Sequence, residues 1–184
     1  MTIRTILPVA VVCVCLPLAG FVCDVGVNPL LFDGSPVTAE FDINSGSTSW
    51  SDSKTLDLQS IVSDISKQID SVKLINITVR VEKVGSMPAG ATVSGTASFN
   101  GTPFLTLTNV AVDSFTTEQS IFKLPPGFAL QNSGINQIIQ ALSSIGGNQE
   151  SSSATLSITG TSSVAPDLKL FVNVYTQVFT PPSK

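Results

Sequence analysis

The side chains that most often carry enzyme chemistry are scarce in this 184-residue chain. It contains no histidine, and its three cysteines all lie within the first 23 residues. Histidine is the commonest general acid or base near neutral pH, and histidine and cysteine are the usual ligands of zinc. No cluster of His, Cys and Asp has the spacing of a metal site. We therefore expect no enzymatic activity, no metal and no other cofactor.

Two pairs of carboxylates remain as candidates for glycosidase chemistry, which needs two acidic groups on either side of the bond that breaks. These are Asp57 with Asp64, and Asp64 with Asp70. Ser63 and Lys67 have the i, i+4 spacing of a serine–lysine dyad on a helix. All of them fall on the polar side of an apolar periodic segment, so we interpret them as a solvated surface.

The first 23 residues have the composition of an export leader. Arg4 precedes an apolar run from Ile6 to Cys23, and the first acidic residue of the chain is Asp24. A basic start, an apolar centre and small residues before a cleavage site are typical of a signal peptide. The run is also close to the roughly 20 residues of a membrane-spanning helix, so a retained anchor is the alternative. We expect an extracytoplasmic protein, located in the periplasm, outer membrane or cell surface.

The end of this leader suggests a lipid anchor. Leu18-Ala19-Gly20 resembles the residues that precede the lipid-modified cysteine of bacterial lipoproteins, where the cysteine follows the small residue directly. Here Phe21 and Val22 stand between Gly20 and Cys23. The resemblance implies that Cys23 carries acyl chains that attach the protein to a membrane. Without the leader at most one cysteine remains, so no internal disulfide supports the fold.

Charge and length limit the remaining possibilities. Loss of Arg4 with the leader changes the formal net charge from −4 to −5. A nucleic-acid partner is not expected, because such partners are bound through clustered Lys and Arg. Roughly 160 residues after the leader suit one hydrophobic core. Residues 24–35 are rich in Gly, Pro and Asn and predict a flexible tether, and residues 36–180 predict a single β-rich domain.

Alternation of apolar and polar residues predicts most of the strands. Asn100-Gly101 between two alternating runs is a strong hairpin signal, because both residues tolerate positive φ. The run 168–179 is apolar on both sides, which indicates a central strand with a layer on each face. The expected strands cover 37–43, 75–82, 92–99, 104–112, 115–124, 156–158 and 168–179, and the apolar cluster after Pro126 is expected in a loop.

Two segments have the spacing of amphipathic helices. The first runs from Leu58 to Val72, and the second from Gly134 to Ile145, where Gly146-Gly147 would end it. The predicted fold class is therefore mainly β or α+β, an antiparallel β-sandwich or curved sheet with two amphipathic helices packed on it.

Two functions fit this architecture. The first is an exported, non-enzymatic binding or structural module, tethered to the cell envelope, that contacts a protein or glycan partner through its sheet or loops. The alternative is a carrier of an apolar, lipid-like ligand in a cavity between sheet and helices. Such a carrier needs a continuous apolar pocket of several hundred Å³. Trp50 is expected to cap the edge of the core. The candidate lining residues, which fit a plain core equally well, are Phe99, Phe104, Phe171, Tyr175 and Phe179.

Overall fold

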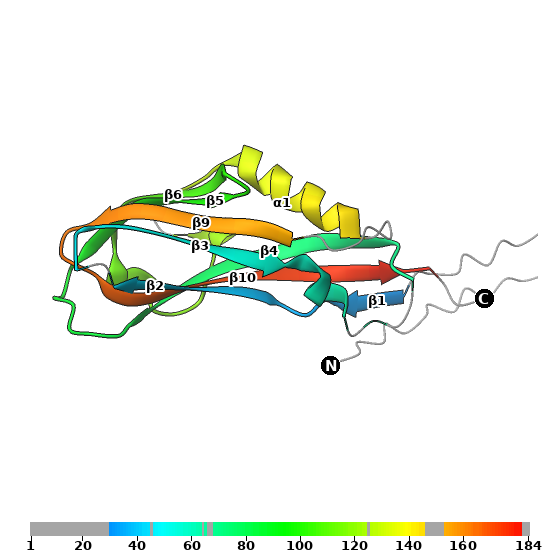
Figure 1. Cartoon of the computed structure of the whole chain (residues 1–184), viewed down its shortest axis with the longest axis horizontal. Coiled ribbons are helices and arrows are strands. Elements are labelled where there is room, and N and C mark those ends of the chain that lie inside the picture. The colour runs from blue at the N-terminus through cyan, green and yellow to red at the C-terminus, as the bar shows by residue number, and fades with distance from the viewer. Residues whose placement is uncertain are drawn as a thin grey trace, which may run out of the picture.

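The computed structural model describes residues 30–44, 46–63, 65, 68–124, 126–145 and 153–181. It shows a mainly β fold in which two antiparallel five-stranded sheets face each other as in a β-sandwich (Figure 1). The leader with Cys23, residues 24–29, Gly146-Gly147 and residues 182–184 lie outside the described residues. No helix in the described part of the chain is long and apolar enough to span a membrane.

The first sheet, sheet A, is built around its last strand. Its members are β1 (Leu30–Asp33), β2 (Val37–Asn44), β4 (Ser71–Lys83), β7 (Gln119–Ser120) and β10 (Asp167–Thr180). β1 and β2 pair one after the other along one side of β10, and β4 pairs along its other side. The predicted central position of 168–179 is confirmed, but a layer covers only the inner face of β10.

The start of sheet A includes part of the expected tether. Leu30–Asp33 forms β1, in which Leu30 pairs with Thr180, so this part of the range 24–35 belongs to the folded domain. The apolar side chains of Leu31 and Phe32 explain why it joins the sheet, since they are half-buried or packed on the core. The two ends of the described domain therefore lie at the same end of the molecule (Figure 1).

β4 departs from simple alternation at one residue. The sequence places Ile75 on the same face as Ile77, Val79 and Val81, but Ile75 is 55% exposed and the other three are buried. The register with β10 shifts at this point, so that Ile75 has no partner between Leu74 and Asn76. An extra residue of this kind is a β-bulge, and it reverses the facing of the residues before it.

The second sheet, sheet B, has the order β3-β9-β5-β6-β8. The hairpin predicted at Asn100-Gly101 is confirmed, with φ of 47° and 80° at the two turn residues. β3 was not expected, because its residues are mostly Ser, Asp and Lys, and the apolar cluster expected in a loop is β8, which pairs with β6. The strands are β3 (Ser49–Asp57), β5 (Thr92–Phe99), β6 (Thr102–Ala111), β8 (Phe128–Leu130) and β9 (Ser153–Ser162).

The second predicted helix is confirmed as α1 (Asn132–Ile145), the one α-helix among the described residues. It buries Ile138, Leu142 and Ile145 and packs against β4 and β6, so it covers the inside of the fold between the two sheets. Gly134 is needed at its start, because a Cβ there would lie 2.3 Å from the carbonyl oxygen of Pro103.

The first predicted helix is wrong. Leu58–Val62 forms only a short 3-10 helix, η1, and β4 has begun by Ser71. Here Ser and Asp side chains bond to the nearby backbone: Asp57 Oδ1 accepts from the Gln59 N–H at 2.9 Å, and Ser60 Oγ donates to the Asp57 carbonyl at 2.6 Å. The Asp57 bond caps the start of η1. The two-helix expectation is therefore not confirmed, although Leu58 and Ile61 are buried as the pattern indicated.

The segment expected as a strand at 115–124 is mostly turns. Two short 3-10 helices, η2 (Val112–Phe115) and η3 (Ile121–Lys123), flank the two-residue strand β7. Phe115 and Ile121 are buried, so the segment closes one side of the core.

Candidate functional site

The structure does not bring the five expected lining residues together. Phe99 and Phe104 are core residues, 2% and 0% exposed. Phe171, Tyr175 and Phe179 are four residues apart on β10. They lie on the side of the strand that faces away from the core, and they are half-buried. None of the five lines the pocket between the sheets.

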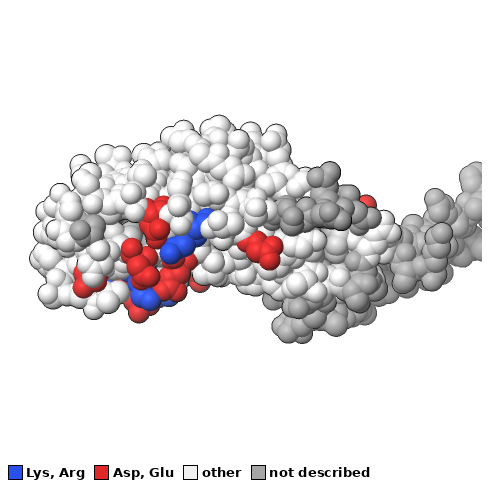
Figure 2. Space-filling model, viewed as in Figure 1, with Lys and Arg blue, Asp and Glu red and all other residues white. Residues whose placement is uncertain are grey.

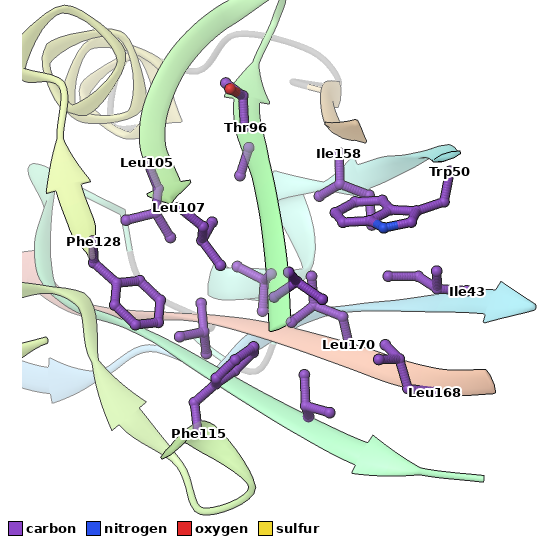
Figure 3. A pocket seen from close by; sticks show the side chains of 15 residues that line it. Ile43, Trp50, Thr96, Leu105, Leu107, Phe115, Phe128, Ile158, Leu168 and Leu170 are labelled. Carbon is purple, nitrogen blue, oxygen red and sulfur yellow. The ribbon is translucent and has the colours of Figure 1, made fainter. Parts of the chain in front are cut away.

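That pocket is a small apolar space between the inner faces of the two sheets (Figure 3). Its volume is about 40 Å³, enough for roughly three water molecules at about 10–15 Å³ each. Drug-sized ligands occupy pockets of about 300–1,000 Å³. Its walls are formed by Ile43, Trp50, Val79, Val81, Val93, Thr96, Ala97, Leu105, Leu107, Phe115, Phe128, Ile158, Leu168, Leu170 and Val172.

Trp50 forms one end of this pocket and packs against the core, as expected of a residue that caps the core edge. It pairs across the sheet with Gly160, which pairs in turn with Gly95. A Cβ on Gly160 would lie 2.4 Å from the indole, and one on Gly95 would lie 3.0 Å from it. The two glycines therefore make room for the ring.

The indole of Trp50 also carries a buried donor, since its Nε1–H has no hydrogen-bond partner among the described residues. A buried donor without a partner costs about 1–3 kcal/mol. The hydroxyl of Thr96 is turned away from the pocket (Figure 3). The surface that the pocket presents is apolar throughout.

The outer face of sheet A carries a second candidate site, the aromatic row of Phe171, Tyr175 and Phe179. The guanidinium carbon of Arg80 lies 4.2 Å from the centre of the Phe171 ring, and Lys73 Nζ lies 4.5 Å from the centre of the Phe179 ring. Both are cation–π contacts. Cations therefore cover two of the three rings.

Glu118 binds to the middle of the aromatic row. Its Oε1 accepts hydrogen bonds from Thr78 Oγ1, from Tyr175 Oη at 2.8 Å and from Asn173 Nδ2 at 3.1 Å. The bonds from Thr78 and then Tyr175 hold the pKa of Glu118 below its ordinary value, and the bond to Glu118 raises the pKa of Tyr175. Glu118 stays an anion and Tyr175 stays protonated, which suits a fixed recognition surface better than proton transfer.

Ion pairs hold the neighbouring charges in place. Lys169 bonds to Glu40 and lies 3.7 Å from Asp42, and the bond with Glu40 raises the pKa of Lys169. Lys83 pairs with Asp113, whose pKa that bond lowers. Figure 2 shows charged side chains gathered near the middle of one face, whereas the upper part of this view, where α1 lies, is nearly free of charge.

Each candidate pair for catalysis has one member outside the described residues, Asp64 or Lys67. Of the other members, Asp57 caps η1, Ser63 Oγ donates to the Ser60 carbonyl at 3.0 Å, and the Asp70 N–H donates to the Phe179 carbonyl at 2.8 Å. Within the described ranges, no group of three or more His, Cys, Asp or Glu could hold a metal ion.

No family model and no curated protein matches this chain. The solved structures that are similar to it include two viral ones. One is described as the acidic stable capsid structure of Helicobacter pylori bacteriophage KHP30, at 18% identity over 84% of this chain and 95% of that one, with a TM-score of 0.33. The other is Desmodium yellow mottle tymovirus, at 10% identity over 100% and 98% of the chains, with a TM-score of 0.37. Likenesses this weak support no argument about function.

The sequence located the residues of the aromatic row but not their partners. Arg80 was expected on the wet face of its strand, and the structure confirms that it points away from the core. Arg80 and Phe171 are about 90 positions apart in the chain. They come into contact because β4 pairs with β10. Glu118 gave no signal, because it falls within 115–124, which was expected as a strand and is mostly turns in the structure.

Proposed function

We propose that this chain is an exported, non-enzymatic binding module, tethered to the cell envelope, that engages a protein partner through the outer face of sheet A. The observation that supports this most directly is the aromatic row on β10 with Arg80 and Lys73 stacked on its rings. Aromatic and Arg side chains are enriched among the residues that dominate the energy of protein interfaces.

A protein partner fits this surface better than a glycan. Sugar rings bind aromatic side chains by stacking on an open face, and the Phe171 and Phe179 rings are already covered by cations. A protein can instead pair carboxylates with Arg80 and Lys73 and place apolar groups between them. The fixed anion of Glu118 adds a charge of the opposite sign, which favours one orientation of the partner.

The place of attachment follows from the chain ends. Leu30 and Thr180 pair at one end of the domain. Six residues lie between Cys23 and Leu30, so a fully extended chain places Leu30 at most about 25 Å from Cys23. An anchor at Cys23 therefore holds that end of the domain near the membrane and leaves the outer sheet faces accessible from the side.

The attachment is tested by intact mass spectrometry of the protein from the membrane and soluble fractions of its native host. We expect a mass beginning at Cys23 with added acyl chains in the membrane fraction, and a shift of Cys23→Ser to the soluble fraction. An unmodified mass beginning near Phe21 in the soluble fraction would contradict the tether.

The contact surface is tested by photo-crosslinking in the same host. A crosslinking amino acid replaces Glu82, which neighbours Arg80 on the outer face of sheet A, or Thr159 on the opposite side of the molecule. We expect one discrete protein adduct from position 82 and none from position 159. Arg80→Gln should abolish the adduct and Lys54→Gln, on β3, should leave it unchanged. Equal adducts from both positions, or an adduct that survives Arg80→Gln, would refute the surface.

A specific observation favours a second candidate function, the carrier. The pocket between the sheets presents only apolar surface and Trp50 forms one end of it, so an apolar molecule would fit its chemistry. The present volume of about 40 Å³ requires the sheets to separate before a larger ligand enters.

Trp50 is the chain's single tryptophan, so its fluorescence reports on the pocket directly. A carrier predicts a saturable change of tryptophan emission on titration with 1-octanol, weakened by Ala97→Val, which narrows the pocket. A linear, non-saturating response that is the same in both proteins would exclude this candidate.

A further inference from the structure

The outer face of sheet B is a regular array of hydroxyl groups. Three neighbouring strands, β3, β9 and β5, carry Ser or Thr at every outward position over three rows. Adjacent members of a row are paired across the sheet. The rows of this hydroxyl grid are Ser49–Thr161–Ser94, Ser51–Thr159–Thr96 and Ser53–Ser157–Ser98.

Most of these hydroxyls are free to bind something else. Ser94 Oγ donates to Asn109 Oδ1 at 3.3 Å and accepts from the Asn109 N–H at 2.8 Å. None of the other eight side chains has a hydrogen-bond partner among the described residues. Each hydroxyl is both a donor and an acceptor and rotates to suit its partner. The grid repeats about every 6.7 Å along the strands and about every 4.8 Å across them.

The hydroxyl grid carries no charged residue, although its edge strand β3 contains charged residues. β3 does carry charges, but Asp52 and Lys54 stand at the alternate positions, opposite the inward-facing Ile158 and Leu156. This reverses the usual pattern, in which charges face outward. Asp57, the charged residue at an outward position of β3, caps η1 through its side chain. The charged side chains of β3 are thus kept off the grid.

We propose that the hydroxyl grid binds an uncharged polysaccharide. The grid has no charged side chain with which to bind a polyanion or a polycation. An uncharged polymer does not need one. A repeating array of donors and acceptors suits a ligand that itself presents hydroxyls at a regular repeat, because many weak bonds then form together. The grid contains no aromatic residue, so the polymer binds through its hydroxyl groups and not by ring stacking. This site is on the opposite side of the fold from the aromatic row and is independent of it.

The test is a pull-down of the full chain with three insoluble neutral polysaccharides: microcrystalline cellulose, chitin and starch granules. We expect depletion from the supernatant by at least one of them. The bound fraction should be unchanged in about 1 M NaCl, where the Debye length falls to about 3 Å and ionic attraction is screened. Binding to none of the three, or loss of binding in salt, would overturn the proposal.

Variants at the centre of the grid make the test specific. Thr159→Val keeps the shape and removes one hydroxyl, so the affinity should fall about threefold, as for one net hydrogen bond. Thr159→Lys should weaken binding at least about tenfold, because the ammonium group is desolvated against an uncharged polymer. The matched control is Thr38→Lys, an exposed strand position on sheet A, which should bind as the wild type does.

Circular dichroism shows whether each variant is folded. If Thr159→Lys and Thr38→Lys are retained equally, the grid is not the binding site and the proposal fails. Two other results would also refute a polysaccharide and assign the grid to another partner. In the first, the protein binds no polysaccharide but inhibits ice recrystallisation, and Thr159→Lys removes that inhibition. In the second, the protein self-associates, and Thr159→Lys removes the self-association.

Discussion

Gly160 is a residue whose identity the structure restricts from two sides. A Cβ there would lie 2.4 Å from the Ser94 carbonyl oxygen and 2.4 Å from the Trp50 indole. The Ser94 oxygen belongs to the backbone of β5 and cannot rotate away, so any larger residue must push the strand or the tryptophan outward. The pocket and the pairing of β9 with β5 therefore depend on the same glycine.

Gly160→Ala should lower the free energy of unfolding by about 2 kcal/mol, within the range for overpacking a filled interior. The measurement is urea denaturation followed by Trp50 fluorescence, which should also shift in the folded state as the ring moves. Ser157→Ala, on the same strand but facing outward, is the control and should change stability by less than about 0.5 kcal/mol. Equal stability of the two variants would contradict the close approach.

Glu118 makes the stability of the molecule depend on pH. Its pKa is held below the ordinary value of 4.5, first by the bond from Thr78 and then by that from Tyr175. A carboxylate with a lowered folded-state pKa stabilises the fold above the unfolded-state pKa, and the contribution disappears as the pH falls through the folded-state pKa. Glu118→Gln should therefore be less stable than the wild type at neutral pH and equal to it in acid.

Denaturation of both proteins from neutral pH down through pH 4.5 and below measures this difference. Glu82→Gln is the matched control, because Glu82 is an exposed carboxylate on the same face, 3.4 Å from Arg80 Nη1. The difference between wild type and Glu82→Gln should change much less with pH. If the lower stability of Glu118→Gln persists unchanged in acid, it comes from altered packing or hydrogen bonding of the amide and not from the missing negative charge.

At the scale of elements, β4 shows how a bulge separates two residues that look alike in the sequence. Ile75 and Ile77 are two positions apart in an alternating run, yet they are 55% and 0% exposed. Ile77→Thr should cost about 2–4 kcal/mol, because it removes buried carbon and buries a hydroxyl. Ile75→Thr should change stability by less than about 0.5 kcal/mol. Chemical denaturation of the two variants compares them directly, and equal costs would contradict the bulge.

The elements that local chemistry determines were predicted well. Asn100-Gly101 fixes a two-residue turn by its positive φ angles, and the stripe of Ile138, Leu142 and Ile145 defines α1. At residues 58–72 the apolar spacing of a helix is present, but the structure has only η1 at Leu58–Val62 before β4 begins at Ser71, and Leu58, Ile61 and Val62 are buried from that short element. Burial was predictable there, and the secondary structure was not.

At the scale of the whole molecule, the features that could not be predicted are those that depend on which strands are neighbours. The sequence shows Phe171 and Tyr175 on one face of a strand, but only the sheet pairing places Arg80 and Glu118 beside them. The hydroxyl grid has the same origin. Each strand's Ser and Thr alternation is visible in the sequence, whereas their alignment into rows requires β3, β9 and β5 to be neighbours.

Assembly of the whole molecule depends on the free edge of sheet B. β3 is the outermost strand of that sheet and is nine residues long, so its unpaired backbone groups could pair with another copy. Asp52 and Lys54 stand at positions that face the core side, with a contact of 3.4 Å between Lys54 Nζ and Asp52 Oδ2. Charges at such positions oppose edge-to-edge pairing, because a second strand would bury them.

Replacing both charges with apolar β-formers, in Asp52→Val with Lys54→Val, should therefore convert the protein to larger species. Size-exclusion chromatography with light scattering measures the mass, and thioflavin T fluorescence detects ordered aggregates. The exchange of Asp52→Lys with Lys54→Asp keeps both charges and the local net charge, so it should elute as the wild type does. If the valine variant and the exchanged variant have the same mass, the charges on β3 do not protect the edge, and its protection must come from β2, which packs beside β3 where the two sheets meet.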